Sequence, residues 1–107
     1  DLTQTTLGIS RDDIGTFLNK YLEAKIFPND PFISIDKKGV GPLLEIGIKK
    51  GKQVKDNLKV GVCGEHGGDP ASIDFFEKIK LDYISASPFR IPISRLAAAH
   101  SSIKEKK

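Results

Sequence analysis

Hydrophobic residues recur every three or four positions in four stretches of the chain, a spacing that predicts amphipathic helices. The first stretch, residues 10–27, begins with Ser10 as a candidate N-cap and ends before a proline-containing segment that fits poorly inside a helix. In the second stretch Pro42 is tolerated only in a first turn. We therefore expect this helix to start near residues 39–41 and to end near Gly51.

The other two predicted helices lie in the second half of the chain. Asp69 followed by Pro70 is a suitable pair of N-cap and first helical residue, and the last helix covers residues 91–104. The residues expected to face inward from the helix that opens at Asp69 are Ile73, Phe76 and Ile79.

Two short apolar runs, residues 58–63 and 81–87, predict strands that alternate with these helices. Strand, loop and helix in this order are typical of parallel strands joined by right-handed crossovers. The sequence therefore predicts an α/β fold. In α/β sheets and barrels, ligands bind at the loops that follow the carboxyl ends of the strands. Cys63 lies at the start of such a loop.

The length of the chain limits what this fold can be. Its 107 residues make one small domain, residues 1–107, or a piece of a larger one. Two or three parallel strands cannot cover their own faces, and exposed sheet edges tend to pair with other chains. We therefore expect the chain to be part of a larger sheet or barrel.

Composition and charge exclude several classes of function. The net charge of +3 comes mostly from lysines in KKGKQVKDNLK and KEKK, which have no aromatic residues between them, so we expect solvated surface and no nucleic-acid partner. No apolar run approaches the roughly 20 residues that span a bilayer, and no signal peptide opens the chain. We expect no membrane partner and a cytoplasmic location, with an organelle left open. A single cysteine excludes an internal disulfide and a zinc site built on several thiolates.

That cysteine, Cys63, lies among four glycines, which are Gly61, Gly64, Gly67 and Gly68. A buried, unreactive thiol is one interpretation. The glycines favour a site, because they let backbone and ligand approach closely. A thiol is mostly protonated at neutral pH and could act as a general acid, or it could act as a nucleophile with His66 as its base. His66 could equally be a hydrogen-bonding loop residue, and a metal site that adds Glu65 and Asp69 is a weaker alternative.

Three motifs resemble the carboxyl-terminal end of the pyruvate, phosphate dikinase family. They are DLTQTTLGISRDD at 1–13, VGVCGEHGGDPASIDF at 60–75 and LDYISASPFRIPISRLAAA at 81–99. Phosphoenolpyruvate synthase and enzyme I of the sugar phosphotransferase system share an ND-L-Q element and a CGE element. The CGEHGGDP form and the DPFISID segment at 30–36 are similar to the dikinase instead. The resemblance implies the last two to three βα units of a (β/α)8 barrel, a domain of roughly 250 residues when complete.

The resemblance also implies a reaction and a site. The family interconverts ATP, phosphate and pyruvate with AMP, diphosphate and phosphoenolpyruvate. Cys63 corresponds to the acid that protonates the pyruvate enolate, and Asp1 corresponds to a ligand of Mg²⁺ that also contacts the substrate. Gly64, Glu65 and His66 are expected to line the same pocket.

The resemblance leaves the chain without several parts of the family's machinery. We expect it to work with the remaining domains of the parent enzyme, to belong to a homodimer there, and to be inactive alone. A barrel fragment of phosphoenolpyruvate synthase or enzyme I, and a non-catalytic assembly module, are the alternatives.

Overall fold

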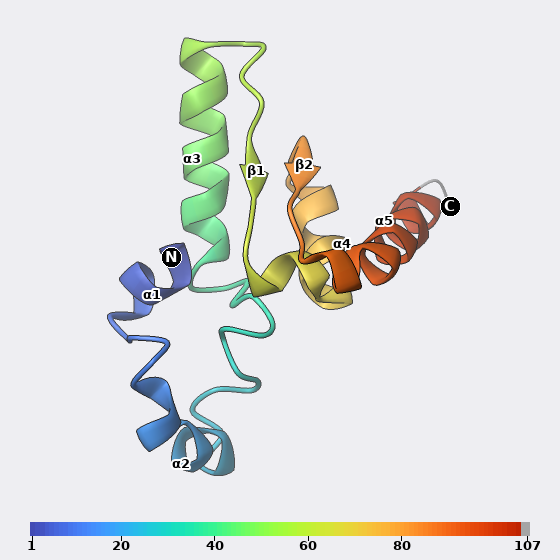
Figure 1. Cartoon of the computed structure of the whole chain (residues 1–107). Coiled ribbons are helices and arrows are strands. Elements are labelled where there is room, and N and C mark those ends of the chain that lie inside the picture. The colour runs from blue at the N-terminus through green and yellow to red at the C-terminus, as the bar shows by residue number, and fades with distance from the viewer. Residues whose placement is uncertain (106–107) are drawn as a thin grey trace.

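The computed structural model describes residues 1–105, so Lys106 and Lys107 of the KEKK tail lie outside the described residues. Helices dominate the fold, and two short strands lie at its centre (Figure 1). In chain order the elements are α1 (Leu2–Leu7), the 3-10 turn η1 (Ile14–Thr16), α2 (Leu18–Glu23), α3 (Gly41–Val54), β1 (Gly61–Val62), the 3-10 turn η2 (Glu65–Gly68), α4 (Pro70–Lys78), β2 (Tyr83–Ile84), the 3-10 turn η3 (Pro88–Arg90) and α5 (Ile91–Glu105).

The two strands pair in parallel, with Gly61 opposite Tyr83 and Val62 opposite Ile84, which confirms the predicted strand direction. Each strand is shorter than the apolar run that predicted it. Among the described residues β1 pairs only with β2, and its other edge has no partner strand. The remaining residues of its apolar run are therefore not part of a sheet. Single backbone hydrogen bonds continue the ladder at both ends, from the Ser85 N–H to the Val62 carbonyl at 2.8 Å and from the Asp82 N–H to the Val60 carbonyl at 2.9 Å.

The described residues contain two βα units, in which α4 follows β1 and α5 follows β2. This arrangement is that of an α/β fold, as the sequence predicted. Helices α4 and α5 lie against each other, joined by hydrogen bonds from Ser101 to Asp74 at 3.1 Å and from Ser102 to Glu77 at 3.0 Å. Two strands do not close a barrel, so the barrel stays a proposal.

The hydrophobic core lies between α3, α4 and the strands. Val40, Ile35 and Phe76 form its centre, with Val62 and Ile84 of the strands packed against it. Ile73 and Phe76 are each 1% exposed, which confirms the predicted inner face of α4. The start of this helix is also confirmed, because the Asp69 carboxylate accepts the Ser72 N–H at 2.8 Å.

Helix α3 begins with Gly41 and Pro42, as predicted, but it does not end at Gly51. It continues to Val54, and the Lys55 N–H donates to the Gly51 carbonyl at 3.0 Å. A Cβ atom at Gly51 would lie 2.7 Å from the Leu58 side chain. The glycine therefore makes room for the chain that returns alongside α3 toward β1 (Figure 1).

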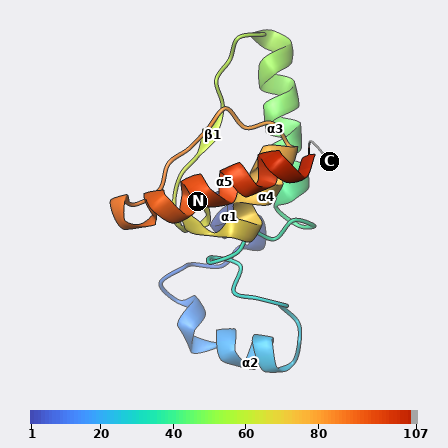
Figure 2. The same cartoon turned by 90° about the vertical axis from the view of Figure 1, so that its right-hand side faces the viewer.

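The predicted helix over residues 10–27 is wrong. The Ser10 hydroxyl accepts the Asp12 N–H at 3.2 Å and closes a local turn, so that only η1 and the short helix α2 follow. This segment has its own cluster of aromatic rings, in which the centroid of Tyr21 lies 4.9 Å from that of Phe17 and 5.5 Å from that of Phe27. Figures 1 and 2 both place α2 at the end of the molecule away from the far end of α3.

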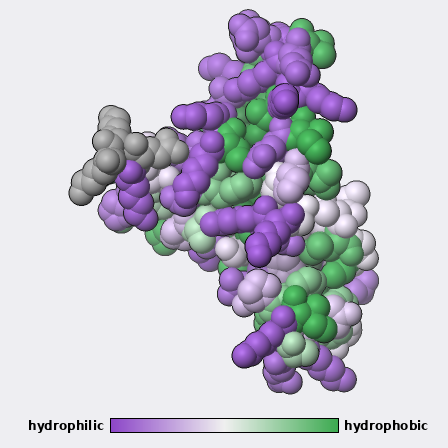
Figure 3. Space-filling model, turned by 180° about the vertical axis from the view of Figure 1, so that it is seen from behind, coloured by the Kyte–Doolittle hydropathy of each residue, from purple (hydrophilic) through white to green (hydrophobic). Residues whose placement is uncertain are grey.

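The surface has an uneven character. Seen from behind, hydrophilic side chains gather at the far end of α3, whereas hydrophobic ones reach the surface lower down (Figure 3). Exposed hydrophobic residues include Phe89 and Leu96, at the start and in the middle of the η3–α5 segment. Across residues 1–105, none of the helices has both the length and the apolar character that a membrane crossing requires.

Candidate functional site

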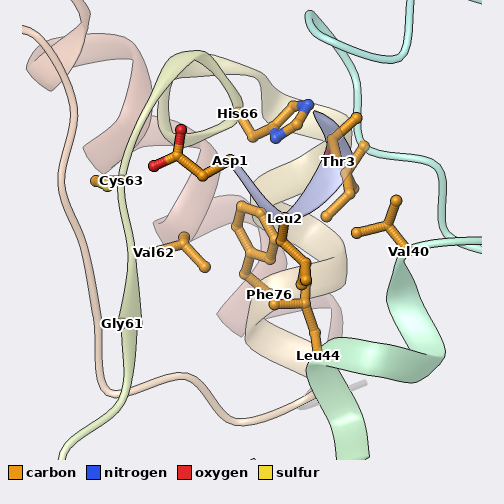
Figure 4. A pocket seen from close by; sticks show the side chains of 11 residues that line it. Asp1, Leu2, Thr3, Val40, Leu44, Gly61, Val62, Cys63, His66 and Phe76 are labelled. Carbon is orange, nitrogen blue, oxygen red and sulfur yellow. The ribbon is translucent and has the colours of Figure 1, made fainter. Parts of the chain in front are cut away.

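Two adjoining cavities lie at the carboxyl end of β1, between α1 and the loop that follows the strand. The larger has a volume of about 220 Å³ and the smaller about 100 Å³. Asp1, Thr3, Cys63 and His66 line both of them, and Figure 4 shows the larger one. The smaller cavity also has Gly64 and Glu65 in its wall, so each residue that the sequence analysis proposed for the site borders this space.

Cys63 is the first residue after β1, and its side chain is exposed. This position disagrees with the interpretation of a buried, unreactive thiol. Strand β1 is anchored below Cys63 by its pairing with β2 and by Val62, which packs on the core. The thiol therefore projects from the end of a fixed strand into accessible space.

Asp1 is the N-cap residue of α1, but its carboxylate makes no capping hydrogen bond to the helix. Aspartate at this position usually accepts a backbone N–H of the first turn. Here the carboxylate instead points toward β1, and the Cys63 thiol lies on the other side of that strand (Figure 4). The carboxylate is therefore available to a ligand.

Gly64 allows the chain to turn sharply after the thiol. Its φ of 90° and ψ of −169° lie in a region that residues with a side chain rarely adopt. The following turn η2 brings Gly67 against β2, where an added Cβ would collide with the Ser85 carbonyl oxygen. The backbone conformation thus requires glycine at position 64, and the close approach of the Ser85 carbonyl requires it at position 67.

His66 is hydrogen-bonded away from the thiol. Its Nε2 lies 2.8 Å from the carbonyl oxygen of Pro31, a residue that is buried. A carbonyl can only accept, so Nε2 carries the hydrogen and the neutral ring has its lone pair on Nδ1. In Figure 4 the ring lies across the cavity from Leu2, beside Asp1 and Thr3. The interpretation of His66 as a hydrogen-bonding loop residue is therefore confirmed.

The segment that contains Pro31, residues 30–36, is called the strap below. Two further bonds fix it to the start of α4, from the Ser34 hydroxyl to the Asp69 carboxylate at 2.9 Å and from the Ile35 N–H to the Ser72 hydroxyl at 2.9 Å. Burial acts to raise the pKa of Asp69, but the hydrogen bonds that its carboxylate accepts from Ser72 and Ser34 outweigh this and hold the pKa below its ordinary value.

Sequence analysis missed four residues that line the smaller cavity. They are Thr3, Gln4, Arg11 and Phe32. The Arg11 N–H donates to the Gln4 side chain at 2.9 Å, which folds the chain after α1 back onto that helix. The prediction of one helix over residues 10–27 puts Arg11 in the first turn of that helix, which gives no reason to place its side chain beside Cys63. The shared ND-L-Q element was the available signal, since Gln4 is its last residue.

The donor atoms around the cavities suit a hard cation only in part. Asp1 and Glu65 both line the smaller cavity, and Mg²⁺ typically takes one or two protein carboxylates and keeps water or substrate oxygens as its other ligands. Within residues 1–105, no three residues of the types His, Cys, Asp and Glu lie close enough together to hold a metal ion. The weaker alternative of a metal site built from Cys63, Glu65, His66 and Asp69 is therefore wrong.

Comparison with known proteins extends these findings. The family model of the PEP-utilising enzyme, PEP-binding domain, matches residues 1–103. The chain is 62% identical to a pyruvate, phosphate dikinase of Rickettsia bellii over 104 residues, which are 97% of this chain and 12% of the relative. It is 56% identical to that of Clostridium symbiosum over 106 residues, which are 99% of this chain and 12% of the relative. It is 59% identical to a chloroplastic pyruvate, phosphate dikinase of Flaveria bidentis over 99 residues, which are 92% of this chain and 10% of the relative.

The match to the family therefore runs from Asp1, beside the cavities, almost to the end of α5. The chain spans about one eighth of the length of the dikinases of Rickettsia bellii and Clostridium symbiosum. On the strength of a match over residues 1–103, the chain belongs to the PEP-binding domain family of PEP-utilising enzymes.

Proposed function

We propose that the chain is the carboxyl-terminal part of a pyruvate, phosphate dikinase, in which it supplies one side of the pyruvate and phosphoenolpyruvate site. The observation that carries the proposal is that Cys63, whose thiol is exposed, and Asp1, whose carboxylate does not cap α1, both line one small cavity at the end of a parallel strand, although they are more than fifty residues apart. Such strand ends are where α/β folds bind ligands. The relatives named as dikinases support the choice within the family.

Cys63 is the general acid and base of this proposal. In the direction of pyruvate formation, the enolate's electron pair forms a new C–H bond with the proton of Sγ, and the thiolate remains. In the opposite direction the thiolate takes a methyl proton from pyruvate, and the enolate oxygen becomes the phosphoryl acceptor. A group placed within reach of the reacting carbon contributes typically 10²- to 10⁴-fold to such a proton transfer. The exposure of the thiol is compatible with that access.

Arg11 and Gly64 suit the binding of a small anion beside the thiol. Arg11 brings a permanent positive charge to a cavity that Asp1 and Glu65 also line, and a guanidinium pairs well with a carboxylate. Gly64 leaves the space next to the thiol free of a side chain. Together these residues would place a carboxylate-bearing substrate against Cys63. Glu65 and His66 belong to the wall of the site.

Asp1 would hold Mg²⁺ through the carboxylate that does not cap α1. A bound Mg²⁺ supplies a Lewis acid that stabilises negative charge on a substrate oxygen. Water and substrate oxygens would supply further ligands, and other parts of the parent protein would complete the set. The remaining domains, the (β/α)8 barrel, the homodimer and the use of ATP are part of the same proposal. The chain alone is then expected to be inactive.

The test is a pair of substitutions in the full-length protein that carries this sequence. Cys63→Ala is expected to lower the exchange of pyruvate methyl protons with solvent by about 10²- to 10⁴-fold. The phosphorylation of the enzyme by ATP is expected to stay unchanged, because that half-reaction does not use the thiol. Ser102→Ala, which removes an α5–α4 hydrogen bond between two residues that line neither cavity, is the matched control.

Two results would contradict the proposal. Normal pyruvate turnover in the Cys63→Ala protein would remove the thiol from the mechanism. A full-length wild-type protein that neither exchanges pyruvate protons nor binds oxalate, an enolate mimic, in the presence of Mg²⁺ would favour a non-catalytic assembly module.

A further inference from the structure

The strap and the loop after β1 form one hydrogen-bonded unit, although they are about 35 residues apart in the sequence. Two bonds join them, from His66 to the Pro31 carbonyl at 2.8 Å and from Ser34 to Asp69 at 2.9 Å, and a third joins the Ile35 N–H to Ser72 in the first turn of α4 at 2.9 Å.

The strap supplies two walls of the cavities. Phe32 lines the smaller cavity together with Cys63 and Arg11, and Ile35 lines the larger one together with Val62. The two ends of the strap differ in how they are held. The Ser34 and Ile35 bonds reach the first turn of α4 and the core, whereas the end at Pro31 and Phe32 has His66 as its tie to the loop after β1.

We propose that His66 is a positioning residue. By donating its Nε2 hydrogen to Pro31, it holds the strap against the loop after β1, so that Phe32 closes the cavity over Cys63 and Asp1. This inference rests on the proposed function, since it assigns the strap to the site where the enolate is protonated. A wall of this kind fixes the distance between the thiol and the reacting carbon, and misplacement by about 1 Å can lower a rate 10²-fold.

Two substitutions of His66 distinguish a positioning role, through the bond to Pro31, from direct contact of the ring with the substrate. Counted in covalent bonds from Cβ, the side-chain nitrogen of glutamine is as distant as Nε2 of histidine, and that of asparagine is as distant as Nδ1. Glutamine can therefore keep the bond to Pro31, whereas asparagine cannot reach it. A role for Nδ1 at the substrate would give the opposite order.

The first test compares these two variants in the full-length enzyme. His66→Asn is expected to lower kcat for phosphoenolpyruvate formation about tenfold, since a lost hydrogen bond corresponds to roughly a 3- to 10-fold effect and the wall moves with it. His66→Gln is expected to stay within about threefold of wild type and to keep the pH profile of kcat. The proposal would be overturned if His66→Asn kept more activity than His66→Gln. It would also be overturned if His66→Gln removed one limb of the pH profile of kcat.

The second test needs no turnover. Hydrogen exchange of the peptide that spans residues 30–36 is measured by mass spectrometry in the full-length protein. His66→Asn and Ser34→Ala should each speed exchange there several-fold, because each removes one tie. His66→Gln should match wild type. Ser102→Ala, which loses a comparable serine–carboxylate bond between α5 and α4, is the control and should leave the strap unchanged.

The outcomes separate the two claims. Unchanged hydrogen exchange of the strap in His66→Asn would refute the proposal that His66 holds the strap, while leaving the role of Cys63 intact. Faster exchange with unchanged kcat would show that the strap is held by His66 but does not position the reaction, which also overturns the proposal. Failure of the proposed function would show itself earlier, as wild-type protein without pyruvate proton exchange.

Discussion

The loop after β1 and the loop after β2 leave the same edge of the sheet and are built alike. Each passes through a 3-10 turn, η2 or η3, and then enters a helix, α4 or α5. They differ in how firmly they are held. The first has buried glycines at its turn and an N-cap aspartate that accepts hydrogen bonds from Ser34 and Ser72. The second has Ser87 at the cap of its turn, which makes no side-chain capping bond, as Gly64 makes none at η2, and its Phe89 is 93% exposed.

The loop after β1 is therefore more tightly packed and hydrogen-bonded than the loop after β2. The residues proposed for chemistry lie on the loop that is tied to α4 and to the strap, not on the one that projects into solvent. A thiol that must meet a reacting carbon needs a fixed backbone. Substitutions in the first loop should therefore cost more stability than Ser87→Ala in the second.

The largest effect on stability is expected from Gly67→Ala. An added Cβ would collide with the Ser85 carbonyl, and backbone cannot rotate away as a side chain can. We expect a loss of about 3 kcal/mol in the free energy of local unfolding. The measurement is hydrogen exchange of peptides from residues 61–85 in the full-length protein. Exchange as slow as in wild type would mean that the two loops are not packed as described.

Asp69→Ala comes next. It removes the cap of α4 and the acceptor for Ser34, and we expect a loss of about 2 kcal/mol. Ser87→Ala removes no capping bond and should change stability by less than about 0.5 kcal/mol. Denaturant midpoints of both variants give the comparison. Equal shifts would show that the two loops are held alike.

A smaller effect is expected from Gly64→Ala. Its φ of 90° strains any residue with a Cβ, although no neighbouring atom blocks the space. We expect about 1 kcal/mol of destabilisation, and a larger fall in pyruvate turnover because Cys63 precedes the strained residue. Unfolding and kinetics measured on the same preparation separate the two consequences. Lost stability with full activity would argue against a fixed thiol.

The smallest expected effect is a loss of stability at acidic pH. The pKa of Asp69 is lower in the folded chain than in the unfolded one, so the folded state binds this proton less readily. The stabilisation is fully present above the unfolded pKa, near pH 4, and is lost as the pH falls through the lower folded value. Asp69→Asn should flatten the fall in stability below about pH 4. The measurement is the slope of the free energy of unfolding against pH in Asp69→Asn and in Ser87→Ala. Equal slopes in the two variants would contradict the role of Asp69.

Much of the fold could be predicted from short stretches of sequence. Asp69 and Pro70 act through their immediate neighbours, so the start of α4 could be predicted from two adjacent residues. The parallel pairing followed from the order of strands and helices. Helix α1 was not predicted, because six residues are too few to show a helical period, and its end at Gly8 depends on a left-handed backbone with a φ of 63°.

The errors and omissions arose where distant contacts decide the structure. The helix expected from Ser10 is broken because Gln4 binds the backbone of Arg11 and Ser10 closes a turn of its own. Nothing near His66 in the sequence indicates that its partner is Pro31. The position of Cys63 at a strand end could be predicted, whereas the wall formed by Phe32 and Arg11 requires the folded chain.

The exposed position of Cys63 gives the site a practical use. The chain has one cysteine and no tryptophan, so a fluorescent or spin label attached to that thiol would report from the edge of the cavity with no competing thiol in this segment. A tryptophan introduced in place of Phe32 would add a second reporter on the strap, whose emission could be followed by energy transfer to the label. The pair would report the separation between the strap and the thiol.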